Sequence, residues 1–330
     1  MTVLVTGAPG WLGSTLVDRL DDRDEDVRCL VYEGLDPAAL DDYDVETVTG
    51  DVTDADSLDD AFAGGVDTVF HCAGVNHPGF RGGVSAIHAI NAGGTRNMLE
   101  AGRRHGVGHF VYVSSIVAEG FSEGPDHLLD EDDPMRPRTE YGKAKLEAEE
   151  HIHDYREAYD IPYTVLRPCW YYGPEQPDRM ATLMQSIDSG RPIMFGNGRN
   201  RRSMTYVPAL VDLMEAVMDT PSVSQDESYV VADQEPYTTN EIYETIARHL
   251  GVDISPLRFR EPFPTVAKYV QRTLERVDCH SQNFHVAWEM SRHIAADPSK
   301  AMRDLDWEPP AALDPGMETA VEWARAHGQV

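Results

Sequence analysis

Lysine is almost missing from this 330-residue chain, which has four lysines against 24 arginines and a formal net charge of −29. Such an excess of acid repels nucleic acid and anionic membranes, so we expect neither as a partner. The acidic residues are spread along the chain, in clusters such as DDRDED (21–26) and DEDD (130–133), and do not form one tail. Dispersed acid with little lysine is typical of a hydrated, salt-adapted surface, so we predict a halophilic protein.

Paired cysteines and long apolar runs are lacking too. No CxxC pair occurs, because the four cysteines stand far apart at Cys29, Cys72, Cys169 and Cys279. This spacing predicts reduced thiols and no metal site. No apolar run is long enough to span a bilayer. The opening MTVLVTGAPG lacks the basic and long apolar regions of a secretory signal, so we expect a cytoplasmic protein.

Strand-like and helix-like stretches alternate through the first half of the chain. The strand-like runs cover residues 2–6, 26–32, 66–74, 109–115 and 163–168. The alternation predicts an α/β fold, a Rossmann-type doubly wound parallel sheet, in residues 1–168. Residues 169–330 predict mainly a smaller, mostly helical substrate-binding domain, with part of 203–240 joining the first domain. In this second part we expect a helix that is N-capped by Thr239 or Asn240 and closed by Gly251.

A glycine-rich turn follows the first strand. Gly7, Gly10 and Gly13 form GxxGxxG where the strand passes into a helix that opens with Trp11 and Leu12. Glycine permits a tight turn and a close approach of the backbone to a pyrophosphate, and the helix N-terminus offers free N–H groups. This context predicts dinucleotide binding by these five residues; the alternative is a simple tight turn.

The end of the second predicted strand bears on the choice between NAD and NADP. Glu33 stands twenty residues after Gly13, where an acid suits the ribose hydroxyls of NAD. No Lys or Arg occurs between Arg28 and Arg81 to neutralise a 2′-phosphate, so NAD is favoured over NADP. The alternative role of Glu33 is a solvated loop acid. In GDVTD (50–54), Asp51 and Val52 are candidates for contact with the adenine.

Two of the four lysines lie in one short segment, YGKAK (141–145). Tyr141 and Lys145 are four residues apart and so share one face of a helix. A nearby ammonium favours the phenolate, which makes the tyrosine a usable acid/base. A strand end about 26 residues earlier supplies Ser114 and Ser115 to hold a substrate oxygen. The alternative is a solvated helix face with a chance YxxxK.

Together these segments resemble the extended short-chain dehydrogenases/reductases, in the NAD-dependent epimerase/dehydratase family. The matching motifs are TGAPGWLG, GDVTD, VFHCAG, NAGGTRNMLEA, VYVSS, YGKAK, LRPCWYYGP and FGNGRNRRSMTYV. The resemblance implies that Tyr141 is the catalytic acid/base with Lys145 as its partner. It also implies Ser115, and not Ser114, as the ligand of the substrate oxygen, with Asn91 as a member of a proton relay.

The same resemblance implies further contacts and an assembly. Ala73 and Pro168 are expected to lie against the cofactor, together with Tyr141 and Lys145. A homodimer is expected through the helices around residues 91–105 and 141–158.

The residues around the predicted substrate pocket limit which reactions of the family are possible. Dehydratases of the family carry an Asp-Glu pair after the catalytic Ser/Thr, where this chain has Ile116 and Val117, so a dehydratase is disfavoured. Arg202 aligns with an arginine that many sugar-nucleotide epimerases use on the substrate diphosphate, and Arg binds phosphate well. Alternatively, Arg202 lies in a surface turn and only balances the charge of nearby acidic residues. Trp170 stands where many such epimerases have an asparagine, and it would also suit an apolar substrate.

Three functions remain open. The leading one is an NAD-dependent oxidoreductase or epimerase that acts on a nucleotide-diphosphate sugar by reversible hydride transfer. The second is a dehydrogenase or reductase of a small or apolar alcohol or ketone, as in the family's steroid- and flavonoid-type enzymes. The third is a non-catalytic NAD-binding regulator on the same fold.

Overall fold

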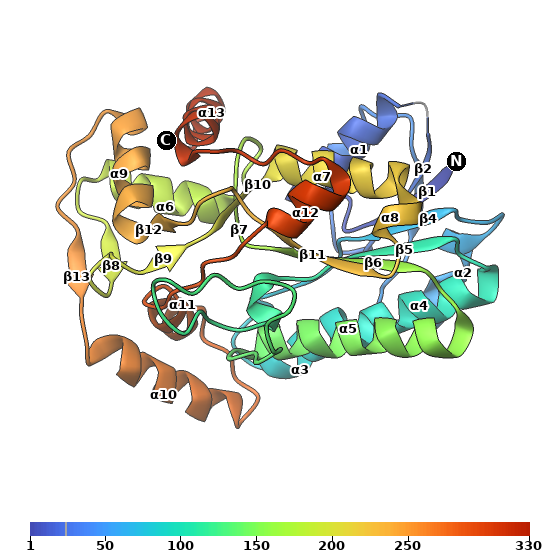
Figure 1. Cartoon of the computed structure of the whole chain (residues 1–330), viewed down its shortest axis with the longest axis horizontal. Coiled ribbons are helices and arrows are strands. Elements are labelled where there is room, and N and C mark those ends of the chain that lie inside the picture. The colour runs from blue at the N-terminus through green and yellow to red at the C-terminus, as the bar shows by residue number, and fades with distance from the viewer. Residues whose placement is uncertain (24) are drawn as a thin grey trace.

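The computed structural model describes residues 1–23 and 25–330, and the backbone alone of residues 178 and 179. One residue of the acidic cluster 21–26 therefore lies outside the described part. A sheet of seven parallel strands crosses the larger part of the molecule, in the order β11-β6-β5-β4-β1-β2-β3 (Figure 1). Its strands are β1 (Thr2–Thr6), β2 (Asp26–Val31), β3 (Glu46–Thr49), β4 (Thr68–His71), β5 (His109–Val113), β6 (Tyr163–Pro168) and β11 (Glu227–Val231). The predicted Rossmann-type sheet is confirmed.

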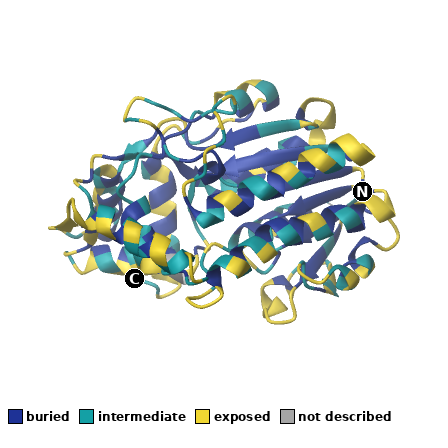
Figure 2. Ribbon diagram, turned by 90° about the horizontal axis from the view of Figure 1, so that it is seen from below, coloured by how far each residue is buried: buried dark blue, intermediate teal, exposed yellow. Residues whose placement is uncertain are grey.

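Helices cover both faces of this sheet because side chains of each strand alternate between the two faces. On one face, Val3 and Val5 pack with α1 (Trp11–Asp21), α7 (Val207–Asp219) and α12 (Ser299–Leu305). On the other, Leu4 packs with residues of α2, α4 and α5. The bounds of the helices on this side are α2 (Asp59–Phe62), α3 (Gly83–His88), α4 (Gly94–His105) and α5 (Glu140–Tyr159). Figure 2 shows the buried strands enclosed by helices with exposed outer faces.

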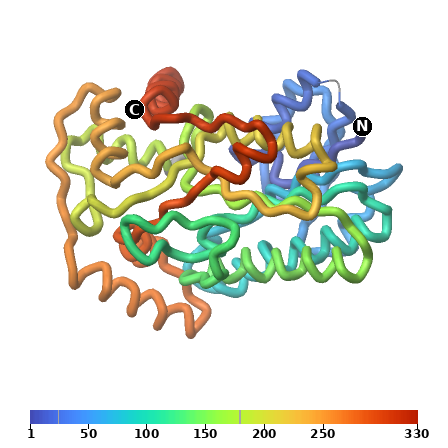
Figure 3. The backbone as a smooth tube through the Cα atoms, viewed as in Figure 1, coloured from blue at the N-terminus to red at the C-terminus, as the bar shows by residue number. Residues whose placement is uncertain are grey.

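The second part of the chain forms a smaller, largely helical unit with its own core. Its main helices are α6 (Asp178–Asp188), α9 (Thr239–Leu250) and α13 (Leu313–Ala326); a short α8 (Pro221–Ser224) lies beside the large sheet. Three two-stranded ribbons join it: β7 (Trp170–Tyr172) with β10 (Met204–Tyr206), β9 (Arg201–Arg202) with β12 (Tyr237–Thr238), and β8 (Ile193–Phe195) with β13 (Leu257–Phe259). The hairpin of α10 (Phe263–Glu275) and α11 (Gln282–Glu289) lies at one edge of the molecule (Figures 1 and 3).

Three details differ from the sequence-based expectation. Strand β3 was missed because its ETVT sequence is polar and mostly exposed, so it shows no apolar alternation. The helix expected around 91–105 begins inside a π-helical turn, Ala89–Gly93, which joins it to the preceding helix α3. Helix α9 is capped by Thr238, not by Thr239 or Asn240, since the Thr238 side chain and Glu241 form a reciprocal capping box. The predicted boundary between two domains at residue 168 stays a prediction.

Candidate active site

The glycine turn is shaped so that a ligand can approach it at Gly10. Gly7 has φ +74°, and a Cβ there would lie 2.9 Å from the backbone nitrogen of Ala73. A Cβ on Gly13 would clash with the backbone of Gly7. These two glycines therefore allow the turn and the helix to pack. A Cβ on Gly10 would meet only the carbonyl oxygen of Gly7 within 4 Å, at 3.1 Å, so the outer side of this residue is open.

Helix α1 begins directly after this turn. Its N-cap is Gly10, and no side chain caps it. Trp11 anchors the helix start to the second part of the chain, because its indole nitrogen donates to the carbonyl oxygen of Pro174 at 2.7 Å. Leu12 is buried in the core beneath. The uncapped helix start and the open Gly10 fit the pyrophosphate of a dinucleotide.

The other predicted cofactor residues lie along the same edge of the sheet. Glu33 is exposed two residues after β2. Asp51, two residues after β3, receives the N–H of Thr53 on its Oδ1 at 2.8 Å. Val52 packs against Gly94 at the start of α4. Since parallel strands end at one edge, the structure brings these residues to the side of the sheet where the glycine turn lies.

Helix α5 carries the predicted tyrosine and lysine at its beginning. Thr139 caps the helix by accepting the N–H of Gly142 at 3.0 Å. The Lys145 ammonium is buried and donates to the carbonyl oxygen of Val113 at 2.8 Å. It lies 5.7 Å from the centre of the Tyr141 ring. Burial lowers the pKa of Lys145 to about 8, so near neutral pH it is cationic but close to its titration point.

The two serines after β5 have different environments. Ser114 is buried, and its hydroxyl donates to Glu149. Ser115 is only partly buried and begins a 3-10 turn, Ile116–Ala118. The side chains of Ile116 and Val117 are buried against Tyr141, where they offer no proton-transfer group. The Ser114 hydroxyl is therefore held in the interior, and Ser115 is the less buried serine of the pair.

A buried ion network under this strand end is a feature that the sequence analysis missed. Arg167 donates to Glu149 at 2.7 Å and to Glu119 at 3.0 Å, and all three side chains are almost fully buried. The signal was an arginine inside the apolar strand YTVLRP, since a buried charge needs a partner. The network holds Ser114, α5 and β6 together, so it supports the site without facing it.

Asn91 lies in the π-helical turn and is fully hydrogen-bonded. Its Nδ2 donates to the carbonyl oxygens of Val75 and Ile87 at 2.7 and 2.8 Å, and its Oδ1 accepts the N–H of Val75 at 3.2 Å. A Cβ on Gly74 would lie 2.8 Å from Asn91 Oδ1 and 3.3 Å from Lys145 Nζ. The structure therefore brings Asn91 and Lys145 to the same small space. π-Helical turns are frequent at functional sites.

On the substrate side, Arg202 is buried beside Trp170. Its guanidinium carbon lies 5.5 Å from the centre of the tryptophan ring. The two Nη atoms of Arg202 donate to the backbone oxygen and to Oε1 of Glu289, at 3.1 and 3.3 Å. Its Nε has no hydrogen-bond partner among the described residues, although the side chain is almost fully buried. An unused donor in this position fits an anionic ligand.

Three histidines from two distant segments of the chain meet near Glu289, the residue that contacts this arginine. His77 Nδ1 and His280 Nε2 are 3.1 Å apart, and His285 pairs with Glu289 at 3.1 Å. Gln271 donates to His280 Nδ1 at 3.0 Å. Spacing could not reveal this cluster, because it is assembled from the loop after β4 and from the α10–α11 hairpin.

His71 and Cys169 have structural roles, and the predicted cofactor contact of Pro168 stays a prediction. His71 is buried and hydrogen-bonded to Thr6 and Thr95, and burial lowers its pKa to about 3. Burial raises the pKa of the Cys169 thiol, which argues against a reactive thiolate. Pro168 ends β6 inside the sheet and pairs with Val231. Within the described part of the chain, no group of three or more His, Cys, Asp or Glu could hold a metal ion, and no helix is long and apolar enough to cross a membrane.

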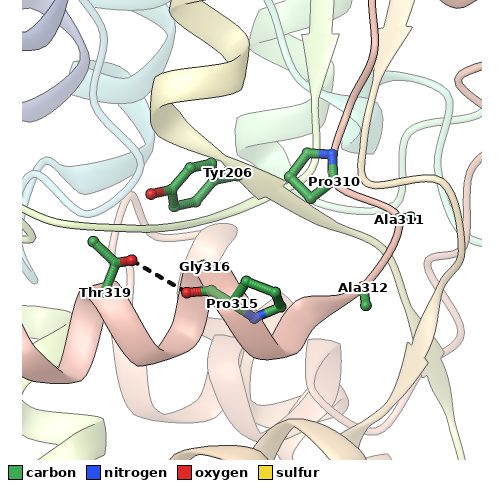
Figure 4. A pocket seen from close by; sticks show the side chains of 7 residues that line it. All are labelled: Tyr206, Pro310, Ala311, Ala312, Pro315, Gly316 and Thr319. Atoms are coloured by element: carbon green, nitrogen blue, oxygen red, sulfur yellow. Dashed lines mark hydrogen bonds between the residues drawn. The ribbon is translucent and has the colours of Figure 1, made fainter.

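Two hollows lie outside the Tyr141–Lys145 region. One, of about 360 Å³, is lined by uncharged side chains near α13, and Figure 4 shows Thr319 donating to the carbonyl oxygen of Pro315 there. Its lining residues are Tyr206, Pro310, Ala311, Ala312, Pro315, Gly316 and Thr319. The other is an open, basic cleft that includes Arg199, Arg258 and Arg260.

The chain is similar to known proteins over most of its length. The chain is 33% identical to the uncharacterized protein y4nL of Sinorhizobium fredii, over 99% of this chain and 96% of the relative. It is 27% identical to N-acetyl-alpha-D-glucosaminyl-diphospho-ditrans,octacis-undecaprenol 4-epimerase of Escherichia coli O157:H7, over 83% of this chain and 80% of the relative.

A solved structure shares the fold. It is UDP-glucuronic acid 4-epimerase from Bacillus cereus in complex with NAD and UDP-4-deoxy-4-fluoro-glucuronic acid, with a TM-score of 0.80 and 22% identity, over 99% of this chain and all of that one. The family model of the NAD dependent epimerase/dehydratase family matches residues 3–232. The chain belongs to the NAD dependent epimerase/dehydratase family.

Proposed function

We propose that this protein is an NAD-dependent oxidoreductase or epimerase that acts on a diphosphate-linked sugar, with a nucleotide-diphosphate sugar as the leading substrate. The observation that carries the proposal is the buried Lys145 ammonium, fixed on Val113 beside the Tyr141 ring. A structural helix residue would not need a buried cation close to its titration point. The same ammonium can hydrogen-bond the ribose of the cofactor and favour the phenolate of Tyr141.

Each residue of the site has a separate role in the proposed reaction. Tyr141 removes the proton from a sugar hydroxyl and returns it to the carbonyl oxygen in the reverse step. Ser115 donates a hydrogen bond to the same oxygen and orients it. Asn91 holds the loop at Val75 next to Lys145, and so keeps a path for a proton relay from Lys145.

The cofactor fits along the edge that begins at the glycine turn. The pyrophosphate would lie on the N–H groups at the start of α1, the ribose hydroxyls near Glu33, and the adenine near Asp51 and Val52. NAD supplies reversible hydride transfer when it is bound. Exposed Glu33, with no Lys or Arg in the sequence from 29 to 80, disfavours the 2′-phosphate of NADP.

The substrate class rests on Arg202. Its Nε has no partner in the described residues, and its place beside Trp170 is suited to a diphosphate near an aromatic face. The relative from E. coli acts on a diphosphate-linked sugar and the B. cereus protein binds a UDP-sugar, which supports the same chemistry here. A dehydratase is disfavoured because buried Ile116 and Val117 cannot transfer protons.

Trp170 favours a second candidate, a dehydrogenase or reductase of an apolar alcohol or ketone. In that function the indole would contact the substrate itself. A non-catalytic NAD-binding regulator is the weakest proposal, since a sensor has no need of Tyr141, Lys145 and Ser115 together. We further propose a halophilic, cytoplasmic homodimer that associates through α4 and α5. Equal thermal stability in dilute buffer and in molar KCl would contradict the salt adaptation.

The function is tested by following NADH formation and sugar epimerisation with a panel of UDP- and dTDP-sugars, steroids and aliphatic alcohols. We expect turnover of a nucleotide sugar, with a higher kcat/KM for NAD than for NADP wherever net oxidation is seen. Turnover of steroids alone would favour the second candidate. Binding of NAD without turnover of any alcohol would favour the regulator.

A further inference from the structure

Exposed apolar side chains gather on the segment that leads into and forms α10. Six of the thirteen large apolar side chains that are exposed in the described residues belong to positions 257–277, each between 37% and 68% exposed. They are Leu257, Phe259, Phe263, Val266, Tyr269 and Val277. We call this set the α10 surface. Ile193, which is 48% exposed, extends it, because it pairs with Leu257 in the β8–β13 ribbon.

The burial of α10 is inverted relative to an ordinary surface helix. Its buried residues are Pro264, Ala267 and Gln271, which lie on the side packed against α11. Phe263, Val266 and Tyr269 are exposed, whereas Val270 and Leu274 are half-buried. Figure 1 shows α10 at the edge of the molecule, outside α11. A helix that fully buries only small or polar residues and exposes three large apolar ones indicates a surface that is covered in use.

The charge around the α10 surface is opposite to that of the whole chain. Residues 257–277 contain five basic residues, Arg258, Arg260, Lys268, Arg272 and Arg276, against two glutamates, whereas the chain has a net charge of −29. Among the described residues, no carboxylate forms an ion pair with Lys268, Arg272 or Arg276.

Other cations lie close by. The pKa of Lys268 is lowered, mainly by burial and then by the nearby positive charges of Arg272, Arg292 and Arg138. Lys268 and Arg272 lie over the ring of Trp288 on α11, at 5.4 and 5.9 Å from its centre. The aromatic and aliphatic side chains of α10 are thus bordered by unpaired cations.

We propose that the α10 surface docks on an anionic lipid bilayer, with α10 lying in the plane of the interface. Aromatic and aliphatic side chains enter the boundary between headgroups and acyl chains, while Lys268, Arg272 and Arg276 meet lipid phosphates. The net charge of the chain predicted no membrane partner. The contact, however, depends on the local charge, because at physiological salt the interaction between charges is screened beyond roughly 8 Å, and acidic residues farther away contribute little.

Docking in this way would bring the substrate side close to the membrane. Helix α11 lies under α10, and its Glu289 contacts Arg202. One helix therefore separates the α10 surface from the candidate diphosphate site. The docking proposal rests on exposure and charge alone, so it stands even if the proposed reaction is wrong.

The test is co-sedimentation of the full chain with vesicles of phosphatidylcholine, with and without about a third of phosphatidylglycerol. We expect at least roughly tenfold tighter binding to the anionic vesicles at about 0.15 M KCl. Val266→Asp combined with Tyr269→Asp should weaken binding by at least about tenfold. Val223→Asp, on exposed α8 away from this surface, is the matched control and should bind like the wild type.

A second pair of variants tests the charges. Arg272→Glu with Arg276→Glu should abolish the preference for anionic vesicles, while Arg104→Glu on α4 should not. At about 2 M KCl the screening length falls to a few Å, so the charge variants should then bind like the wild type. Melting temperature and turnover without vesicles establish that each variant is folded.

Two results would overturn the proposal. One is that the wild type binds neither kind of vesicle, or that the aspartate variants bind as well as it does. The other is that the aspartate variants instead lower the sedimentation mass in lipid-free solution, which would make the α10 surface an interface between copies of this chain.

Discussion

Replacement of Arg202 by methionine separates the diphosphate-sugar function from its alternatives. Methionine keeps the bulk next to Trp170 and removes the charge. A charge-assisted hydrogen bond contributes about 1.5–3 kcal/mol. If Nε and the Nη atoms hold a diphosphate, the substrate KM should therefore rise by roughly 10- to 100-fold, since about 1.4 kcal/mol corresponds to a factor of ten. The KM for NAD should stay unchanged, because the predicted cofactor residues lie along the edge of the large sheet at the glycine turn and not around Arg202.

Glu289 sharpens this experiment because it engages both Nη atoms of Arg202. Glu289→Gln keeps the backbone acceptor and the side-chain oxygen but removes a negative charge close to the substrate phosphates. Removing that repulsion should lower the substrate KM by about fivefold, equivalent to about 1 kcal/mol. If Arg202 only stabilises α11 through Glu289, both variants should lower the melting temperature and leave KM unchanged.

The matched control is Arg201→Met. Arg201 is the preceding residue of β9, so its side chain lies on the opposite face of the strand and contacts Pro125 and Glu235 instead. The assay is steady-state turnover of a nucleotide sugar at saturating NAD and constant high salt, with melting temperatures measured in parallel. Equal KM values for the Arg202→Met and Arg201→Met variants would refute the role of Arg202 in substrate binding.

Four further outcomes are expected. Tyr141→Phe should lower kcat by roughly 100-fold or more and leave the Kd for NAD nearly unchanged in calorimetry, since only the proton donor is lost; an active variant would refute the assigned chemistry. Gly10→Val should abolish NAD binding without unfolding the protein, because a Cβ there meets one backbone oxygen and otherwise fills the open side; unchanged affinity would mean that the turn has no cofactor role. Affinity for NAD should fall as the pH rises through about 8, where Lys145 loses its proton, and a Lys145→Met variant should show no such step. Burial raises the pKa of Asp233 to about 7 from 3.8, so the stabilisation present at low pH is lost as the pH rises through 7; Asp233→Asn should therefore gain on the order of 2–4 kcal/mol relative to the wild type between pH 5 and 8 in urea unfolding.

Local sequence patterns were sufficient for the parts of the site that are continuous in the chain. The glycine turn and the Tyr141–Lys145 pair each depend on a few neighbouring residues, so spacing alone could propose them. Strand β6 and helix α5 were also predicted almost to the residue, because an apolar β-branched run and a long charged stretch ended by Pro162 are strong signals.

Contacts between segments that are distant in the sequence could not be predicted in this way. The pairing of β11 with β6, the contact of Glu289 with Arg202, and the meeting of His77 with His280 all join residues more than 60 positions apart. No local spacing carries such information. Ser114 and Ser115 are adjacent and chemically identical, so the sequence separated them only through the family resemblance, whereas in the structure Ser114 is buried on Glu149 and Ser115 is not fully buried.

The position of β11 has a consequence for how the protein can be divided. The chain leaves the large sheet after β6, builds much of the smaller unit, and then returns to place α7 on one face and β11 at the edge. A fragment that ends at residue 168 would therefore expose the hydrogen-bonding edge of β6 and the apolar face that α7 covers. We expect such a fragment to aggregate, and we expect the intact chain to melt in a single transition. A ligand that binds only the smaller unit should then also protect the glycine turn from unfolding.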